Sequence, residues 1–253
     1  MSKVNQMLVD WKTGDVHGLE WLREKGIDQR LAYSYFESGY LNKIGPGVFT
    51  KKNDQINPLA LARFLQEELH LKLHVSGRSA LELQGLGHYV PLGENQRFQL
   101  TSYEDRAFPS WVSKLEKSFE LIFKKSSLLV KESYLSTFED RHFDIKISSR
   151  ELAILELINS LELSNSLETV ENYTESLSTL RPEVLQELLE ECRSVKVKRV
   201  FLYVSEKLGL GFFAKLDLSR ISLGNGKRVI VKDGMFDKKY QITVDRDYGE
   251  NPF

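Results

Sequence analysis

A helix followed at once by a tight hairpin is the feature that most restricts the fold of this chain. The segment DQRLAYSYFESGYLNKIGPGVFTKK runs from Asp28 to Lys52. Its first part has apolar residues at helical spacing, Gly39 is a typical helix end, and Gly45-Pro46-Gly47 separates two short β-prone runs. Both glycines of this turn are able to adopt positive φ around the fixed φ of Pro46. The buried stripe of the predicted helix comprises Leu31, Ala32, Tyr35 and Phe36.

Two further helices are predicted upstream of this unit. Residues 1–11 can form one helix, and the next runs from an N-cap at Asp15 to a stop at Gly26. Three helices and a hairpin within residues 1–56 predict a winged helix-turn-helix domain.

In such a domain the helix that begins after Asp28 would enter the major groove of DNA. The side chains expected to reach base edges or phosphates from its outer face are Gln29, Arg30, Tyr33 and Ser34. The cations expected to meet phosphates on or beside the wing are Lys43, Lys51 and Lys52. Small winged helices also serve as protein-interaction modules, and residues 1–56 carry eight Lys and Arg against seven Asp and Glu. A protein partner for this domain therefore stays open from the residues alone.

The remainder, residues 57–253, is predicted to form a second domain of mixed strands and helices. Strands are expected at 97–102 and 118–125, and Ser148 with Glu151 has the spacing of a capping box before the next helix. Helices should follow at 167–180, 182–193 and 197–208. The acidic run Glu183 to Glu191 is interpreted as the solvated side of the second of these helices. Residues 151–200 carry ten acidic against five basic residues, so this stretch is a poor candidate for binding an anion. The predicted fold class is α+β.

Few residues suggest catalysis or metal binding. The chain has no Gly-rich phosphate loop, HExxH or GxSxG motif, and its single Cys192 cannot form an intrachain disulfide. His70 and His74 stand four residues apart but lack an evident third ligand. Arg78, Glu82 and Gln84 could line a site, but they are more simply solvent-facing residues of a helix. We therefore expect no catalytic residue, no metal and no cofactor.

One enzymatic alternative remains. Asp144 and Lys146 have the Asp-x-Lys pattern of some metal-dependent nucleases, although alternating charges on an exposed strand produce the same string.

No stretch approaches the roughly 18 consecutive apolar residues of a membrane span, and the first residues lack the pattern of a signal peptide. We expect a cytoplasmic protein that does not contact a membrane.

Three strings in this order resemble the AbiEi family, the antitoxins of AbiE-type (type IV) toxin–antitoxin systems. They are YLNKIGPGVFTKK at the hairpin, HVSGRSALELQGLGHYVPLG after it, and ISSRELAILELI near mid-chain. The resemblance implies a non-enzymatic protein of phage defence by abortive infection. Its winged helix would bind repeats in its own promoter as an autorepressor, and its C-terminal domain would counteract a nucleotidyltransferase-like toxin. The alternatives from the residues are the nuclease at Asp144 and Lys146 and a transcription factor with a ligand-sensing C-terminal domain.

Overall fold

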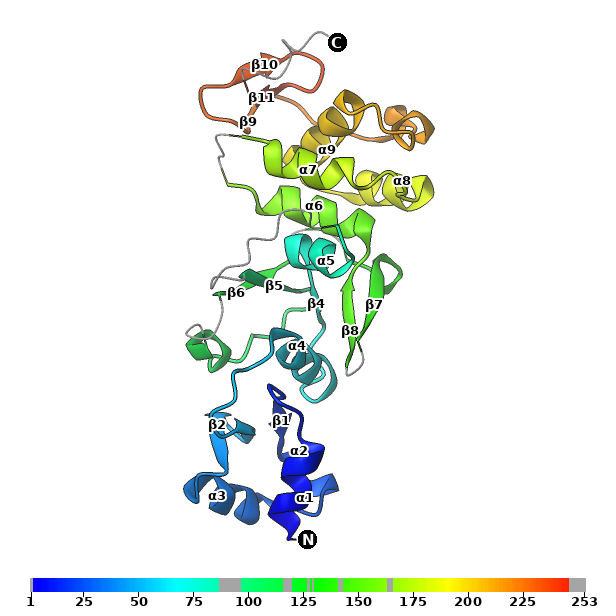
Figure 1. Cartoon of the computed structure of the whole chain (residues 1–253). Helices are drawn as coiled ribbons and strands as arrows, with labels where there is room; N and C mark the ends of the chain where they lie inside the picture. Colours follow the sequence, from blue (N-terminus) through cyan, green and yellow to red (C-terminus); the bar gives the residue numbers. More distant parts are fainter. Residues whose placement is uncertain are drawn as a thin grey trace. The chain divides into compact units, whose positions relative to one another are not determined.

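The computed structural model describes residues 2–86, 97–115, 120–126, 128, 130–140, 143–162 and 166–245. The chain divides into two compact units. Unit 1 comprises residues 1–75, 92–125 and 137–146, and unit 2 comprises residues 76–91, 126–136 and 147–253. Both units contain helices and strands (Figure 1), so the mixed α+β class predicted from the sequence is confirmed.

The N-terminal part of unit 1 is a winged helix-turn-helix. Its elements are α1 (Lys3–Asp10), β1 (His17–Gly18), α2 (Leu19–Glu24), α3 (Gln29–Glu37), β2 (Leu41–Gly45) and β3 (Val48–Lys51). The three strands form an antiparallel sheet in the order β1-β3-β2. A buried cluster that includes Trp11, Leu22, Ala32 and Phe49 joins the three helices to this sheet. Burial of these side chains is the main force that holds so small a fold together.

Helix α3 begins and ends where the local sequence predicts. The Asp28 carboxylate accepts a hydrogen bond from the Leu31 amide at 2.8 Å, which satisfies one of the free amides of the first turn. At the other end Gly39 has a φ of +76°. The amide of Tyr40 bonds the carbonyl of Tyr35, and the amide of Gly39 bonds that of Phe36, which together make a Schellman motif.

Two details of this region differ from the expectation. Helix α2 is capped by Gly18 and not by Asp15, because His17 and Gly18 pair with Phe49 and Val48 of β3 and are therefore extended. Asp15 is buried beside His17 instead. The helical phase of α3 is also shifted: Phe36 is 39% exposed, whereas Tyr33, expected on the outer face, packs against the core.

After the winged helix the chain forms a five-stranded sheet in the order β6-β5-β4-β8-β7, most of which belongs to unit 1. Its strands are β4 (Leu73–Val75), β5 (Arg97–Ser102), β6 (Glu120–Lys125), β7 (Leu135–Asp140) and β8 (Phe143–Ser148). Strand β5 pairs antiparallel with β4 and parallel with β6. The additional helical elements are α4 (Pro58–Glu67), the short turn η1 (Val112–Leu115) and the short turn η2 (Glu132–Tyr134), the last of which lies in unit 2.

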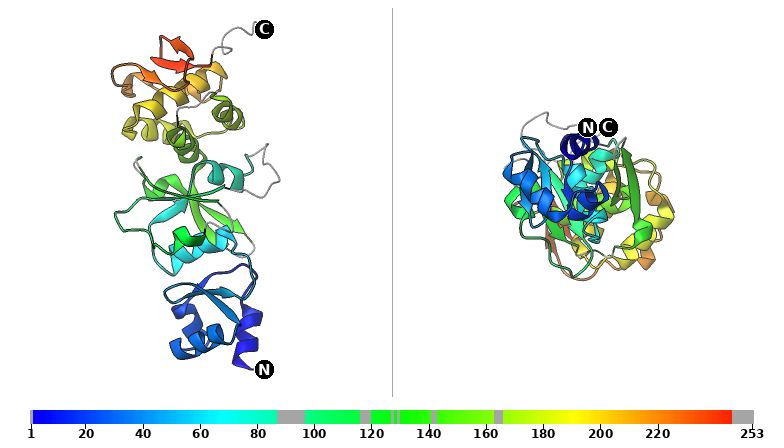
Figure 2. Two further views of the ribbon diagram at one scale, coloured as in Figure 1. Left: turned by 90° about the vertical axis from the view of Figure 1, so that its left-hand side faces the viewer. Right: turned by 90° about the horizontal axis from the view of Figure 1, so that it is seen from below.

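Unit 2 is largely helical and carries a small sheet near its C-terminal end (Figures 1 and 2). Its helices are α5 (Gly77–Leu83), α6 (Arg150–Ser160), α7 (Glu168–Glu175), α8 (Pro182–Glu191) and α9 (Val195–Lys207). Helix α6 is packed against the other four and is buried along most of its length. After the turns η3 (Phe213–Lys215) and η4 (Leu218–Arg220), the chain forms β9 (Arg228–Val229), β10 (Met235–Asp237) and β11 (Ile242–Val244) in the order β10-β11-β9.

The start of α6 differs by one residue from the predicted capping box. Ser149 is the N-cap, and its hydroxyl accepts a hydrogen bond from the Leu152 amide at 3.3 Å. The hydroxyl of Ser148 instead donates to the buried carboxylate of Glu156 at 2.5 Å. The two adjacent serines therefore have different partners, which spacing alone does not distinguish.

Candidate nucleic-acid interface

The outer face of α3 presents three of the predicted contact residues to solvent. Gln29, Arg30 and Ser34 are exposed. Within the described part of the chain, no hydrogen bond or ion pair engages the Arg30 guanidinium. Its donors are therefore available for an external acceptor such as a guanine edge or a phosphate. Glu37 is exposed on the same helix and limits its positive field.

Tyr33 is half-buried and connects the helix to the hairpin. Its ring lies edge-on to Phe49 at 5.7 Å between centroids, and Phe49 is completely buried. The ammonium of Lys43 lies 4.9 Å from the centroid of the Tyr33 ring. This cation–π contact holds Lys43 of β2 beside α3. The Tyr33 ring thus supports the lysine and also presents its own edge for a contact.

The hairpin lysines differ in exposure. Lys43 pairs with Phe49 and Lys51 with Leu41, so both lysines share the face of the hairpin that covers the core. Lys43 is exposed and Lys51 is half-buried. Lys52 follows the end of β3, is exposed, and donates its backbone amide to the carbonyl of Tyr40 at 3.1 Å. The structure thus brings Arg30, Tyr33 and Lys43 to one region and places Lys52 at the open end of the hairpin.

Two other cations of the winged helix have partners within it. The Lys25 ammonium bonds Asp10 at 2.9 Å, and the Lys3 ammonium donates to the Gly26 carbonyl at 3.2 Å. Burial, with a further contribution from Tyr40, raises the pKa of Tyr35, so this phenol stays neutral at physiological pH. Arg23 of α2 is exposed and, like Arg30, has no hydrogen bond or ion pair to its side chain among the described residues, so the available positive charge lies on α2, α3 and the hairpin.

The winged helix is joined to α4 by a polar cluster that the sequence does not reveal. Glu68, just after α4, accepts the Gly18 amide at 2.7 Å and lies 3.1 Å from Nδ1 of His17. His17 is buried and stacks on Trp21 with centroids 3.8 Å apart. No local pattern predicts this contact, because Glu68 and His17 lie 51 residues apart.

The residues of the nuclease alternative lie on one strand of the five-stranded sheet. Asp144 and Lys146 are exposed on β8. Glu151, which the sequence places nearby, is buried, and both its oxygens bond the Arg181 guanidinium at 3.0 and 2.9 Å. Among the described residues, no group of three or more His, Cys, Asp or Glu is arranged to hold a metal ion.

The two histidines of the possible metal pair lie in different environments. His70 is exposed with a φ of +50°, and His74 is buried in β4.

The possible site at Arg78, Glu82 and Gln84 resolves into separate contacts in unit 2. Arg78 Nε bonds Glu82 at 2.7 Å, and the Tyr173 hydroxyl donates to the same carboxylate at 3.0 Å. Arg78 and Tyr173 line an open pocket of about 370 Å³. Gln84 instead donates to the carbonyls of Ala80 and Ser148. The pairing of Arg78 with Glu82 leaves this pocket without a net positive charge.

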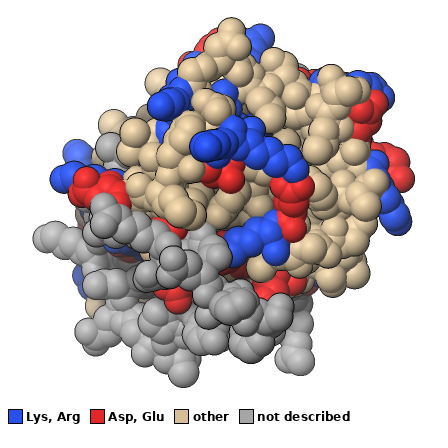
Figure 3. Space-filling model, turned by 90° about the horizontal axis from the view of Figure 1, so that it is seen from above, with Lys and Arg blue, Asp and Glu red and all other residues tan. Residues whose placement is uncertain are grey.

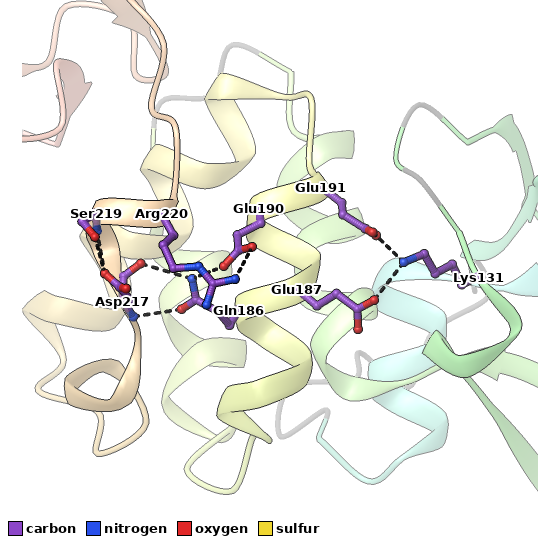
Figure 4. A network of polar contacts seen from close by, with 8 residues as sticks. All are labelled: Lys131, Gln186, Glu187, Glu190, Glu191, Asp217, Ser219 and Arg220. Atoms are coloured by element: carbon purple, nitrogen blue, oxygen red, sulfur yellow. Dashed lines mark hydrogen bonds and ion pairs between the residues drawn. The ribbon is translucent and has the colours of Figure 1, made fainter.

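The acidic side chains of α8 lie on the side away from its buried leucines, and several of them form ion pairs. Lys131 bonds both Glu187 at 2.8 Å and Glu191 at 2.5 Å, and Arg220 bonds Glu190 at 2.9 Å (Figure 4). Leu185, Leu188 and Leu189 form the buried side, as expected.

Basic residues also occur near the C-terminal end of unit 2. Residues 213–245 include seven Lys and Arg and four Asp and Glu. On the face that Figure 3 shows, acidic side chains lie next to basic ones in several places. This face therefore does not present one continuous positive field.

The order of helices and strands in residues 3–51 defines a winged helix-turn-helix. The chain also forms unit 2, which is largely helical. Two family models together match nearly the whole chain. The model of the AbiEi antitoxin N-terminal domain, a transcriptional regulator, matches residues 1–92, and that of the transcriptional regulator and AbiEi antitoxin of type IV TA systems matches residues 95–245. The chain belongs to the AbiEi antitoxin family of transcriptional regulators, which confirms the resemblance seen in the sequence.

A solved structure shares the fold. It is the crystal structure of the RV2827C protein from Mycobacterium tuberculosis, which matches with a TM-score of 0.60 and 14% sequence identity. The match covers 91% of this chain and 86% of that one. A comparison with curated proteins found no match. None of the helices in the described residues is long and apolar enough to cross a membrane.

Proposed function

We propose that this protein is an antitoxin that binds double-stranded DNA at repeats in its own promoter, represses its own operon, and counteracts a cognate nucleotidyltransferase-like toxin. The DNA contacts would be made by Gln29, Arg30, Tyr33 and Ser34 of α3 and by Lys43, Lys51 and Lys52 of the hairpin. The observation that carries this proposal is the unpaired Arg30 on the exposed face of α3, with Lys43 held over the ring of Tyr33 on the same helix. The activity needs no catalytic residue, metal or cofactor, and it would take place in the cytoplasm, where the promoter is.

The charge arrangement supports a division of contacts. Arg30 lies on α3, where a recognition helix reaches base edges, and a bidentate arginine–guanine contact discriminates between bases. The hairpin lysines would meet phosphates, which contribute affinity without sequence preference. Counteraction of the toxin is assigned to residues 57–253 because the winged helix, residues 1–56, is occupied with DNA.

The test is titration of the full chain with its own promoter DNA and with a scrambled duplex. Arg30→Ala should cost about 1–3 kcal/mol on the promoter and relax the preference at one base position. Arg23→Ala, an exposed arginine on α2, is the matched control and should change neither. Unchanged affinity and base preference in Arg30→Ala would remove α3 from the recognition role.

A separate assay addresses the toxin. With a cognate nucleotidyltransferase-like toxin expressed from an unrelated promoter, the full chain should restore growth, and the same should hold for Arg30→Ala. Absence of protection by the unaltered chain would contradict the antitoxin part of the proposal and leave the DNA-binding part standing.

A further inference from the structure

The turn of the hairpin is covered by a residue from outside the winged helix. Of the two turn glycines, both able to adopt positive φ, only Gly47 does so, at +69°. At Gly45 the constraint is space: a Cβ atom there would lie 2.7 Å from a ring carbon of Trp111. Glycine is thus required at position 45 by the close approach of the indole.

Trp111 is itself held in place within unit 1. Its ring lies 6.2 Å from that of Phe64, edge-on, and Phe64 is 1% exposed in α4. The next residue, Val112, begins η1 and is completely buried. The indole is therefore anchored to α4 and η1, outside the winged helix.

The fixed turn is two residues from Lys43. The pairing of β2 with β3 shifts register between Lys43 and Gly45, so Ile44 is the extra residue of a β-bulge. A bulge changes the direction in which the neighbouring side chains point. On the other side of the bulge the Lys43 ammonium lies over the Tyr33 ring. The segment from Lys43 to Gly45 is therefore contacted at both ends, by Tyr33 at Lys43 and by Trp111 at Gly45.

We propose that Trp111 is a positioning residue for DNA binding. By packing on Gly45 it holds the turn and the bulge in the geometry that directs Lys43 to a phosphate beside α3. This inference rests on the proposed function. It also means that the part of the chain after residue 56 contributes to DNA binding without touching DNA.

The experiment measures the affinity of the full chain for promoter DNA over a range of salt concentrations. Loss of one phosphate contact lowers the slope of log K against log salt by about 0.9. We expect this loss in Lys43→Ala and again in Trp111→Ala. The double variant should show no further loss, and Trp111→Phe should recover most of the slope.

Two further variants separate positioning from general stability. Val112→Ala removes a buried side chain beside Trp111 and should lower the melting temperature while keeping the slope. Gly45→Ala displaces the indole without removing it and should reproduce the slope of Trp111→Ala. It provides the same test should Trp111→Ala not fold at the assay temperature.

The outcomes distinguish this inference from the proposed function. An unchanged slope in Lys43→Ala overturns the Lys43 phosphate contact, and with it this inference, while the contacts proposed for Lys51 and Lys52 stand. A reduced slope in Lys43→Ala with unchanged slopes in folded Trp111→Ala and Gly45→Ala overturns only the positioning role. Additive losses in the double variant do the same.

Discussion

Helices α3 and α8 are both amphipathic, with one buried side and one charged side, but their charges have different partners. The carboxylates of α8 bond Lys131 and Arg220 of unit 2. The Arg30 guanidinium of α3 has no such partner among the described residues. A net charge of -1 for the whole chain conceals this difference. The distribution of unpaired charge, more than its sum, indicates where a ligand can bind.

The paired charges of unit 2 serve its own structure. Exposed ion pairs contribute at most about 1 kcal/mol each, so the contacts of α8 mainly fix its orientation. Arg199 likewise uses its charge within unit 2, with more hydrogen bonds. It is 2% exposed, and its guanidinium donates to the carbonyls of Leu223, Gly224, Gly226 and Gln241.

The largest expected effect comes from removing the region with the unpaired charges. A chain of residues 57–253 should lose repression of its promoter completely and still protect cells from the toxin. The measurement is a promoter–reporter assay together with growth under toxin expressed from an unrelated promoter. The division of the two activities at residue 57 is wrong if protection requires residues 1–56.

Removal of residues 1–56 also takes away the partners of Glu68 and Trp111. The control is therefore a full-length chain with Arg30→Ala and Lys43→Ala combined, which keeps these contacts. It should also lose repression and retain protection.

The second prediction compares two arginines of unit 2. Arg199→Met should lower the free energy of unfolding by about 3 kcal/mol or more, because four partly buried hydrogen bonds from the buried guanidinium to backbone carbonyls are lost. Arg193→Met, an exposed position, should stay within about 0.5 kcal/mol of the parent. Denaturant unfolding followed by circular dichroism measures both. Equal effects would contradict the structural use of Arg199.

Local signals in the sequence predicted much of the fold. Asp28 and Gly39 gave the bounds of α3, and the hairpin follows from the Gly-Pro-Gly turn. Strand β5 has the predicted residues, 97–102. Each of these elements is determined by caps, turns or alternation within its own segment.

The structure differs from the prediction where the conformation of a segment depends on residues far away in the sequence. Residues 17 and 18 form a strand only because β3 supplies their partners. Tyr33 packs inward because Phe49 lies beneath it, a contact that helical periodicity cannot indicate. For the candidate site, residue types and exposure could be predicted for Arg30 and Lys52. The contacts of Lys43 and Trp111 required the structure.

The third prediction uses a paired carboxylate of unit 2. Burial acts to raise the pKa of Glu151, but hydrogen bonds from the side chain and backbone of Arg181 outweigh it and lower the pKa to about 2. The folded state therefore binds this proton less readily than the unfolded state, whose carboxyl has a pKa near 4.5. The stabilisation is complete above about pH 4.5 and is lost as the pH falls toward 2.

Glu151→Gln should consequently be less stable than the parent at pH 7, and the difference should shrink at pH 3. Melting temperatures at the two pH values measure it. Glu183→Gln, an exposed position on α8, is the control and should melt like the parent at both. A difference for Glu151→Gln that does not depend on pH would show that packing, and not the ion pair with Arg181, is what the carboxylate contributes.

The smallest expected effect concerns a single exposed lysine and sharpens the contrast between base and phosphate contacts. Lys52→Ala should weaken binding to promoter and scrambled DNA by the same factor, because a phosphate contact carries no sequence information. It should lower the salt slope by about 0.9, and the melting temperature should not change, since Lys52 is exposed. Lys72→Ala, an exposed lysine outside the helix and hairpin, is the matched control. If Lys72→Ala lowers the slope as much as Lys52→Ala, the DNA surface extends beyond α3 and the hairpin to the start of β4 in the five-stranded sheet. The contrast between unpaired and paired regions must then be redrawn to include it.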